Sequence, residues 1–74
     1  MTSQAATPTP VVSSVLVSVT YAPDGTLDLL FQSGARYRYF AVPPTVVAAL
    51  LAAPSKGAFF TRAIRSHFRY QRQA

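Results

Sequence analysis

The chain has 74 residues, half of them apolar, a formal net charge of +5 and no cysteine. A chain of this length forms one small domain and buries only about 60% of its unfolded surface. Without cysteine, neither disulfide bonds nor zinc–thiolate sites can hold that domain together. The positive charge favours an anionic partner, such as nucleic acid, anionic lipid or an acidic protein surface.

Residues 1–12 are rich in Thr, Ala and Pro without periodicity, which predicts a flexible N-terminal tail before a single domain over residues 13–72. This beginning lacks the basic and apolar segments of a signal peptide. The longest apolar run, residues 46–53, is shorter than the about 20 residues of a membrane helix. We therefore expect a cytoplasmic protein with no membrane partner, and we take it to be a monomer.

The first two predicted strands form a hairpin around a turn at residues 22–25. Residues 13–21 alternate with a period of two, as strands do. In the turn Pro23 presets φ, Asp24 can bond its own backbone and Gly25 accepts positive φ. Five residues separate Tyr21 from Leu27, so these two can pair on the core face. The predicted faces are Val15, Val17, Val19 and Tyr21 in the first strand and Leu27, Leu29 and Phe31 in the second.

A third strand over residues 36–40 follows a turn at Ser33-Gly34. A two-residue loop would place Arg38 opposite Leu29 and bury an unpaired charge, which costs several kcal/mol. A three-residue loop with Gly34 in a left-handed bulge position avoids this cost. It leaves Arg36 and Arg38 on the outer face. The expected pairs on the core face are then Tyr37 opposite Phe31 and Tyr39 opposite Leu29.

Two helices are predicted after the strands. Pro43 and Pro44 suit a helix start, and Pro54 ends this first helix, which spans residues 44–53. Its inward residues are expected to be Val47, Leu50 and Leu51. Ser55 is the predicted N-cap of a second helix that continues toward residue 72. The predicted fold class is α+β: a three-stranded antiparallel meander followed by two helices packed on one sheet face (βββαα).

The second predicted helix carries five of the seven basic residues. At 100° per residue, one side holds an apolar stripe and the other holds Arg62, Arg65 and Arg69. The apolar side comprises Phe60, Ala63, Ile64, His67 and Phe68. No acid lies on this helix, whereas a purely solvated face normally mixes charge signs. The pattern therefore favours binding to phosphates or to an acidic protein, with a solvated face as the alternative.

Three further features leave alternatives open. Lys56-Gly57 at a helix start could hold an anion, or Gly57 could simply allow close packing. Tyr37 and Tyr39 could stack on bases, although the loop argument places them in the core. His67, the only histidine, has no partner pattern for metal binding or catalysis. We therefore predict no catalytic residues, no metal and no cofactor.

One set of residues stands out by its order and spacing: Ser13-Ser14, Val19, Tyr21, Gly34, Tyr37-Arg38-Tyr39, Val42-Pro43, Ser55, Gly57, Phe60, Ile64-Arg65 and Phe68. In this order and spacing the chain resembles the KTSC domain, a short module named for the C-terminus of some lysyl-tRNA synthetases and also found alone. The resemblance covers about residues 12–72. The chain departs from the family at Ala22, Val47 and Thr61, where Asp, an aromatic residue and Asn are common.

The resemblance implies an RNA-binding role, and similar phage proteins act on bacterial RNA polymerase as transcription regulators. The family has no established catalytic residues. We therefore predict a basic binding module of the transcription and RNA apparatus, a transcription regulator that docks on RNA polymerase or another acidic protein surface. Direct binding of RNA phosphates is the alternative, and an enzyme is a distant third. The predicted contact residues are Arg36, Arg38, Lys56, Arg62, Arg65 and Arg69.

Overall fold

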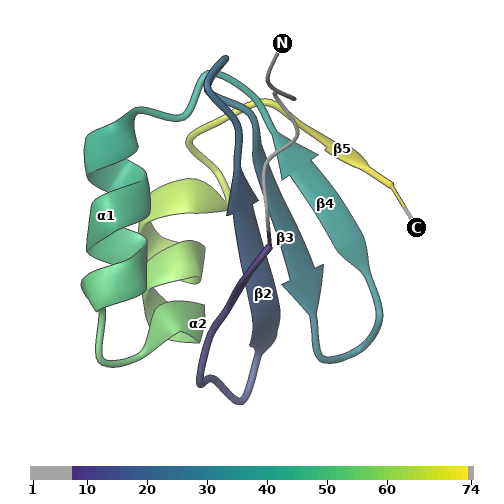
Figure 1. Ribbon diagram of the computed structural model, residues 1–74, viewed down its shortest axis with the longest axis vertical. Helices are drawn as coiled ribbons and strands as arrows, with labels where there is room; N and C mark the ends of the chain where they lie inside the picture. The colour runs from purple at the N-terminus through teal and green to yellow at the C-terminus, as the bar shows by residue number, and fades with distance from the viewer. Residues whose placement is uncertain (1–7, 74) are drawn as a thin grey trace, which may run out of the picture.

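Five antiparallel strands form one sheet, and a layer of helices covers one of its faces (Figure 1). The computed structural model describes residues 8–73. The elements are β1 (Thr9–Pro10), β2 (Leu16–Tyr21), β3 (Leu27–Phe31), β4 (Arg36–Tyr39), α1 (Pro44–Ala52), α2 (Lys56–Phe59), the π-helical segment η1 (Phe60–Ile64) and β5 (Tyr70–Arg72). The strands lie across the sheet in chain order. The predicted α+β class is confirmed, with the helices on one sheet face.

The sheet has two more strands than the predicted meander, one at each edge. β1 lies within the expected tail and pairs with β2, so the sheet begins before residue 13; residues 1–7 of that tail lie outside the described residues. β5 lies within the expected second helix and pairs with β4. The prediction of three strands is therefore wrong. Both edge strands satisfy backbone groups that β2 and β4 would otherwise leave open, a gain that no local sequence pattern displays.

A β-bulge in β2 changes which of its residues face the core. The ladder to β3 slips by one residue between Leu16 and Ser18, so Val17 is an extra residue. Leu16 and Val19 are consequently both buried, although three positions separate them along the strand. Val15 and Val17 are exposed, so the predicted inward face is wrong at these two positions and correct at Val19.

The first hairpin has the predicted turn. Asp24 Oδ1 accepts the Thr26 N–H at 2.9 Å, and Gly25 has a φ of +90°. Tyr21 lies opposite Leu27, as the loop argument predicts.

The second hairpin confirms the predicted loop but shifts the pairing. Gly34 has a φ of +92°, and the Phe31 N–H donates to the Ala35 carbonyl at 2.9 Å. The loop has the predicted length of three residues, but it lies one residue earlier than expected, at residues 32–34. Gly34 is then the last loop residue, the position that takes positive φ in a loop of this kind. The pairing with β3 is consequently shifted by two residues. The tyrosines lie on the core face as predicted. Their partners differ from the expected ones: Tyr37 lies opposite Leu29, and Tyr39 lies opposite Leu27.

Helix α1 starts at Pro44, as expected, and packs through Val47 and Leu50, which are both buried. Leu51 was expected to face inward but is 38% exposed. One residue corresponds to about 100° of helix rotation, so Leu51 lies past the edge of the contact that Leu50 makes. The helix ends one residue before the predicted position, still ahead of Pro54.

The second helical segment begins as predicted and ends early. The Ser55 Oγ accepts the Ala58 N–H at 3.3 Å, which confirms the N-cap. α2 then widens into η1, where the Arg65 N–H bonds to the Phe60 carbonyl at 2.9 Å. Phe60 and Ile64 are buried, as expected. The predicted continuation past Ile64 is wrong: the chain turns there, and this turn lets residues 70–72 reach the free edge of β4.

Candidate functional site

The two acidic side chains of the chain, Asp24 and Asp28, are both engaged in contacts in the first hairpin and its neighbouring strand. Asp28 accepts hydrogen bonds from Arg38 Nε at 2.8 Å and from its second guanidinium nitrogen at 3.1 Å. This bond and the charge of Asp28 raise the pKa of Arg38. Asp24 lies in the first turn, where hydrogen bonds from the side chain and the backbone N–H of Thr26 lower its pKa. Both acids are therefore engaged away from Arg62, Arg65 and Arg69, the arginines of η1 and of the segment after it.

Arg36 and Arg38 were predicted as contact residues, and the structure separates them from the other candidates. Both side chains alternate with Tyr37 and Tyr39 along β4, so they lie on the sheet face away from the helices. Arg36 is exposed there. Arg38 is already paired with Asp28 in a two-bond geometry, so a partner would have to compete with that carboxylate.

Lys56 and Gly57, the candidates for an anion site, each make a structural contact. Lys56 Nζ donates to the Ala53 carbonyl at 3.0 Å, just beyond the end of α1. A Cβ at Gly57 would lie 2.7 Å from Val15 Cγ2, closer than side-chain carbons approach. Glycine is thus required by close packing of α2 on the segment before β2. Helix α2 has only four residues, too short for a useful dipole.

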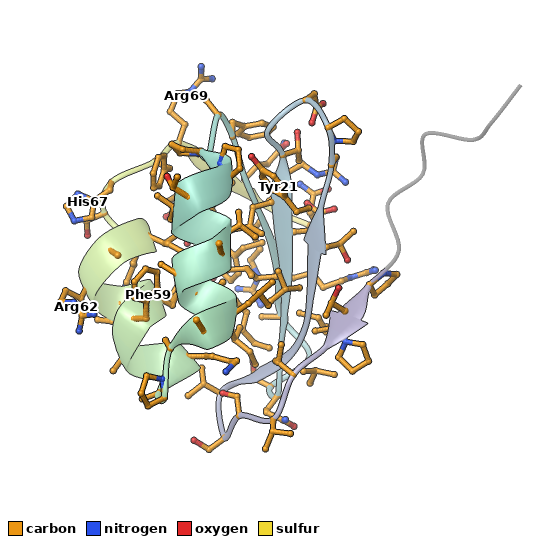
Figure 2. The ribbon with its side chains drawn as sticks, turned by 60° about the vertical axis from the view of Figure 1, so that its left-hand side comes forward. Tyr21, Phe59, Arg62, His67 and Arg69 are labelled. Carbon is orange, nitrogen blue, oxygen red and sulfur yellow. The ribbon has the colours of Figure 1, made fainter. Side chains whose placement is uncertain are left out.

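Arg62, Arg65 and Arg69 are all exposed, but they do not form the predicted helical row. The helix ends at Ile64, so Arg69 comes from the connection to β5. Figure 2 shows Arg69 at the top of the molecule and Arg62 far from it, on the outer side of η1. The Arg62 guanidinium carbon lies 5.5 Å from the ring centroid of Phe59. Arg62 and Arg69 are thus far apart, and the three cations do not form one compact row.

His67 has a structural role in the turn after η1. It was expected on the apolar side of a helix, but it is exposed and points outward in Figure 2. Its Nε2 lies 3.0 Å from the Arg62 carbonyl, one of the carbonyls left open where the helix ends. Within residues 8–73 no group of three potential metal ligands is present. In the same part of the chain, no helix is long and apolar enough to cross a membrane.

An aromatic groove of about 600 Å³ lies between the β4–β5 edge of the sheet and the end of η1. Its floor comes from the helix-side residues of β4 and β5, and its wall comes from η1 and the turn that follows. The lining residues are Phe31, Tyr37, Tyr39, Phe60, Arg65, Ser66, Phe68 and Tyr70. Among the six basic residues predicted as contacts, only Arg65 lines this groove.

The rings of the groove are packed against one another. Tyr39 lies 5.4 Å from Tyr70 and 5.7 Å from Phe60, centroid to centroid. Tyr37 lies 5.7 Å from Tyr70, and the Arg72 guanidinium carbon lies 5.8 Å from the Tyr37 centroid. Burial, together with the hydroxyls of Tyr70 and Tyr37, raises the pKa of Tyr39, and the charge of Arg65 opposes this rise.

Tyr70 is the groove residue that the sequence pattern missed. It is 55% exposed, whereas Tyr39 is buried and Tyr37 is half-buried. The prediction that Tyr39 belongs to the core is correct, and the open ring surface comes mainly from Tyr70. The alternation of Tyr70 and Arg72 around Gln71 is the only local signal for a strand here, and three residues are too few to outweigh a helical pattern.

The sequence profile of the KTSC domain matches residues 12–68, more than half of the chain. The chain belongs to the KTSC domain family. A KTSC domain protein from Yersinia pestis has the same fold, with a TM-score of 0.90 and 31% identity, covering 95% of this chain and 100% of that one. The family match ends before β5, so Tyr70 lies outside the matched residues.

Two kinds of protein resemble this KTSC domain in sequence. An uncharacterized protein from Stutzerimonas stutzeri is 50% identical over 62 residues, covering 81% of this chain and 87% of its own length. Lysine–tRNA ligases from Nostoc and Trichormus variabilis are 50% and 48% identical over 46 residues. The matched segment covers 62% of this chain but only 8% of each ligase. The domain therefore occurs both in small proteins and as a minor part of large ones.

Proposed function

We propose that this KTSC domain is a small, non-enzymatic binding module of the transcription and RNA apparatus, and that RNA is its direct partner. One observation carries the proposal: Arg62, Arg65 and Arg69 are all exposed. The two aspartates are engaged elsewhere, Asp28 with Arg38 in the sheet and Asp24 in the first turn. Since both acidic side chains of residues 8–73 are engaged elsewhere, these arginines attract a polyanion.

The relatives support RNA over other polyanions. The lysine–tRNA ligases are named for an enzyme that acts on tRNA, and they contain a segment similar to this chain. A guanidinium presents a planar set of donors that suits phosphate oxygens. Docking on RNA polymerase or another acidic protein surface, the first expectation from the sequence, stays a prediction and is one outcome of the test below.

The test is the salt dependence of binding to a fluorescent single-stranded RNA. If arginines contact phosphates, log K falls linearly with log salt, with a slope of about −0.7 per contact. Replacing Arg62, Arg65 and Arg69 together by Gln should reduce the magnitude of that slope by about two units. The matched control replaces the same three residues by Lys, which keeps the charges and most of the slope.

A pull-down from lysate separates the two partner classes. If capture of the partner disappears after nuclease treatment, RNA is the bridge or the ligand. If RNA polymerase is captured equally with and without nuclease, and the purified chain does not bind RNA, the RNA proposal is wrong and protein docking replaces it. If the triple Gln variant binds RNA as tightly as the parent chain, the arginines are only a solvated surface.

A further inference from the structure

The helical layer leaves part of the sheet's inner face open. In Figure 1, α1 and α2 lie over the β2 side, and β5 is at the edge away from α1. The groove of about 600 Å³ occupies the uncovered part, and its floor includes Tyr37 and Tyr70. An uncovered inner face is normally occupied by a partner or filled by a further element, since aromatic rings gain by leaving water.

The open ring in this groove is rigidly supported. Tyr70 is 55% exposed, and two other tyrosine rings lie within 5.7 Å of its centroid. Its backbone is held by the ladder to Tyr39, so the ring position is fixed by both packing and hydrogen bonding. A planar group can therefore stack on Tyr70 without first ordering a flexible side chain, which lowers the entropic cost of binding.

Arg65 supplies a positive charge at the same groove. It lines the same cavity as the rings of Tyr39 and Tyr70, so its side chain borders the aromatic floor. Among residues 8–73, the groove lining includes no carboxylate. A ligand that fits must combine a flat aromatic group with a negative charge close to it. A nucleotide has this combination, and in RNA the base is available for stacking only where the strand is unpaired.

We propose that this groove binds one unpaired nucleotide of single-stranded RNA, with the base stacked on Tyr70 and its phosphate held by Arg65. This inference rests on the proposed function. It adds a defined binding site for one base of the strand to the separate phosphate contacts. The nucleotide lies next to Tyr37, and Ser66 supplies a neutral hydroxyl donor in the groove wall. A base-paired duplex offers no such group and binds through its phosphates alone.

The experiment measures binding of the full chain to a fluorescent ten-nucleotide RNA, as a single strand and as a duplex. Tyr70→Ala should weaken binding of the single strand about tenfold and leave its salt slope unchanged, because stacking is not an ion contact. Tyr70→Phe should bind like the parent chain, because it keeps the ring. Leu51→Ala, at an exposed apolar residue of α1 outside the groove, is the matched control and should have no effect.

The outcomes distinguish failure of the groove inference from failure of the proposed function. If Tyr70→Ala binds the single strand as tightly as the parent while the triple Gln variant loses affinity, the groove inference is wrong and RNA binding stands. If neither variant differs from the parent, both fail. A free mononucleotide that binds as tightly as the strand would make the groove a site for soluble nucleotides and overturn the RNA assignment. A circular dichroism spectrum like the parent's shows that Tyr70→Ala is folded.

Discussion

The inner face of the sheet has two regions that differ in chemistry. Between β2, β3 and the helices, the side chains are aliphatic and almost fully buried: Leu16, Val19, Leu27, Leu29, Leu50 and Ile64. Over β4 and β5, the same face presents tyrosines and an arginine, and a groove remains open. The cause is size, since a nine-residue helix and a short second segment cannot cover five strands. Residues with a ring and a polar tip suit the boundary that remains.

Phe60 joins the two regions, because it is buried under η1 and also lines the groove. Phe60→Ala should lower the free energy of unfolding by about 3–5 kcal/mol, the usual cost of emptying a buried Phe site. Loss of this size could exceed the total stability of so small a domain. Urea denaturation followed by circular dichroism measures it. Unchanged stability would show that the two regions are not packed on a common wall.

Close packing in the covered region should be visible at Gly57. Gly57→Ala gains about 1 kcal/mol of helix propensity but places a Cβ against the stiff Val15 side chain, which costs about 1–3 kcal/mol. The net expectation is a loss of about 1 kcal/mol in the free energy of unfolding. In a Val15→Ala background the clash is absent, and the same substitution should stabilise the protein. The absence of this sign reversal would contradict tight packing here.

A side-chain hydrogen bond links β2 to the segment just before α1. The Tyr21 hydroxyl donates to the Val42 carbonyl, and Figure 2 shows Tyr21 at the upper end of the sheet beside α1. Tyr21→Phe keeps the ring and removes the bond, so the free energy of unfolding should fall by about 1 kcal/mol. Thermal unfolding measures this, and a stability equal to the parent's would show that water replaces the bond without cost.

The smallest effect is expected at high pH, at the boundary between the two regions. Burial raises the pKa of Tyr39 in the folded protein, so the folded state holds its proton more tightly than the unfolded state. Its contribution is therefore intact below the unfolded pKa of about 10, and is lost as the pH rises through the folded pKa. When the pH is raised from neutral to above about 10, the free energy of unfolding should fall less for Tyr39→Phe than for the parent chain, because Phe has no proton to lose. Parallel stability curves for the two proteins would contradict the burial of Tyr39.

Local patterns determined much of this structure. Turn residues such as Asp24 and Gly25 fix backbone angles through their own chemistry, and Ser55 caps the helix that follows it. The alternation of β3 and β4 placed Leu27, Leu29 and Tyr39 in the core, because a strand repeats every two residues wherever it lies. The excess of arginine over acid is likewise a property of the sequence alone.

Tertiary structure decided what depends on distant backbone groups. The bulge at Val17 and the end of the helix at Ile64 both interrupt a regular local pattern, and each goes with strand pairing to a distant part of the chain. The strand at Tyr70 exists because β4 has a free edge, and that edge is far away in the sequence. The aromatic groove follows from this strand, so no reading of the last 20 or so residues as a helix could contain it.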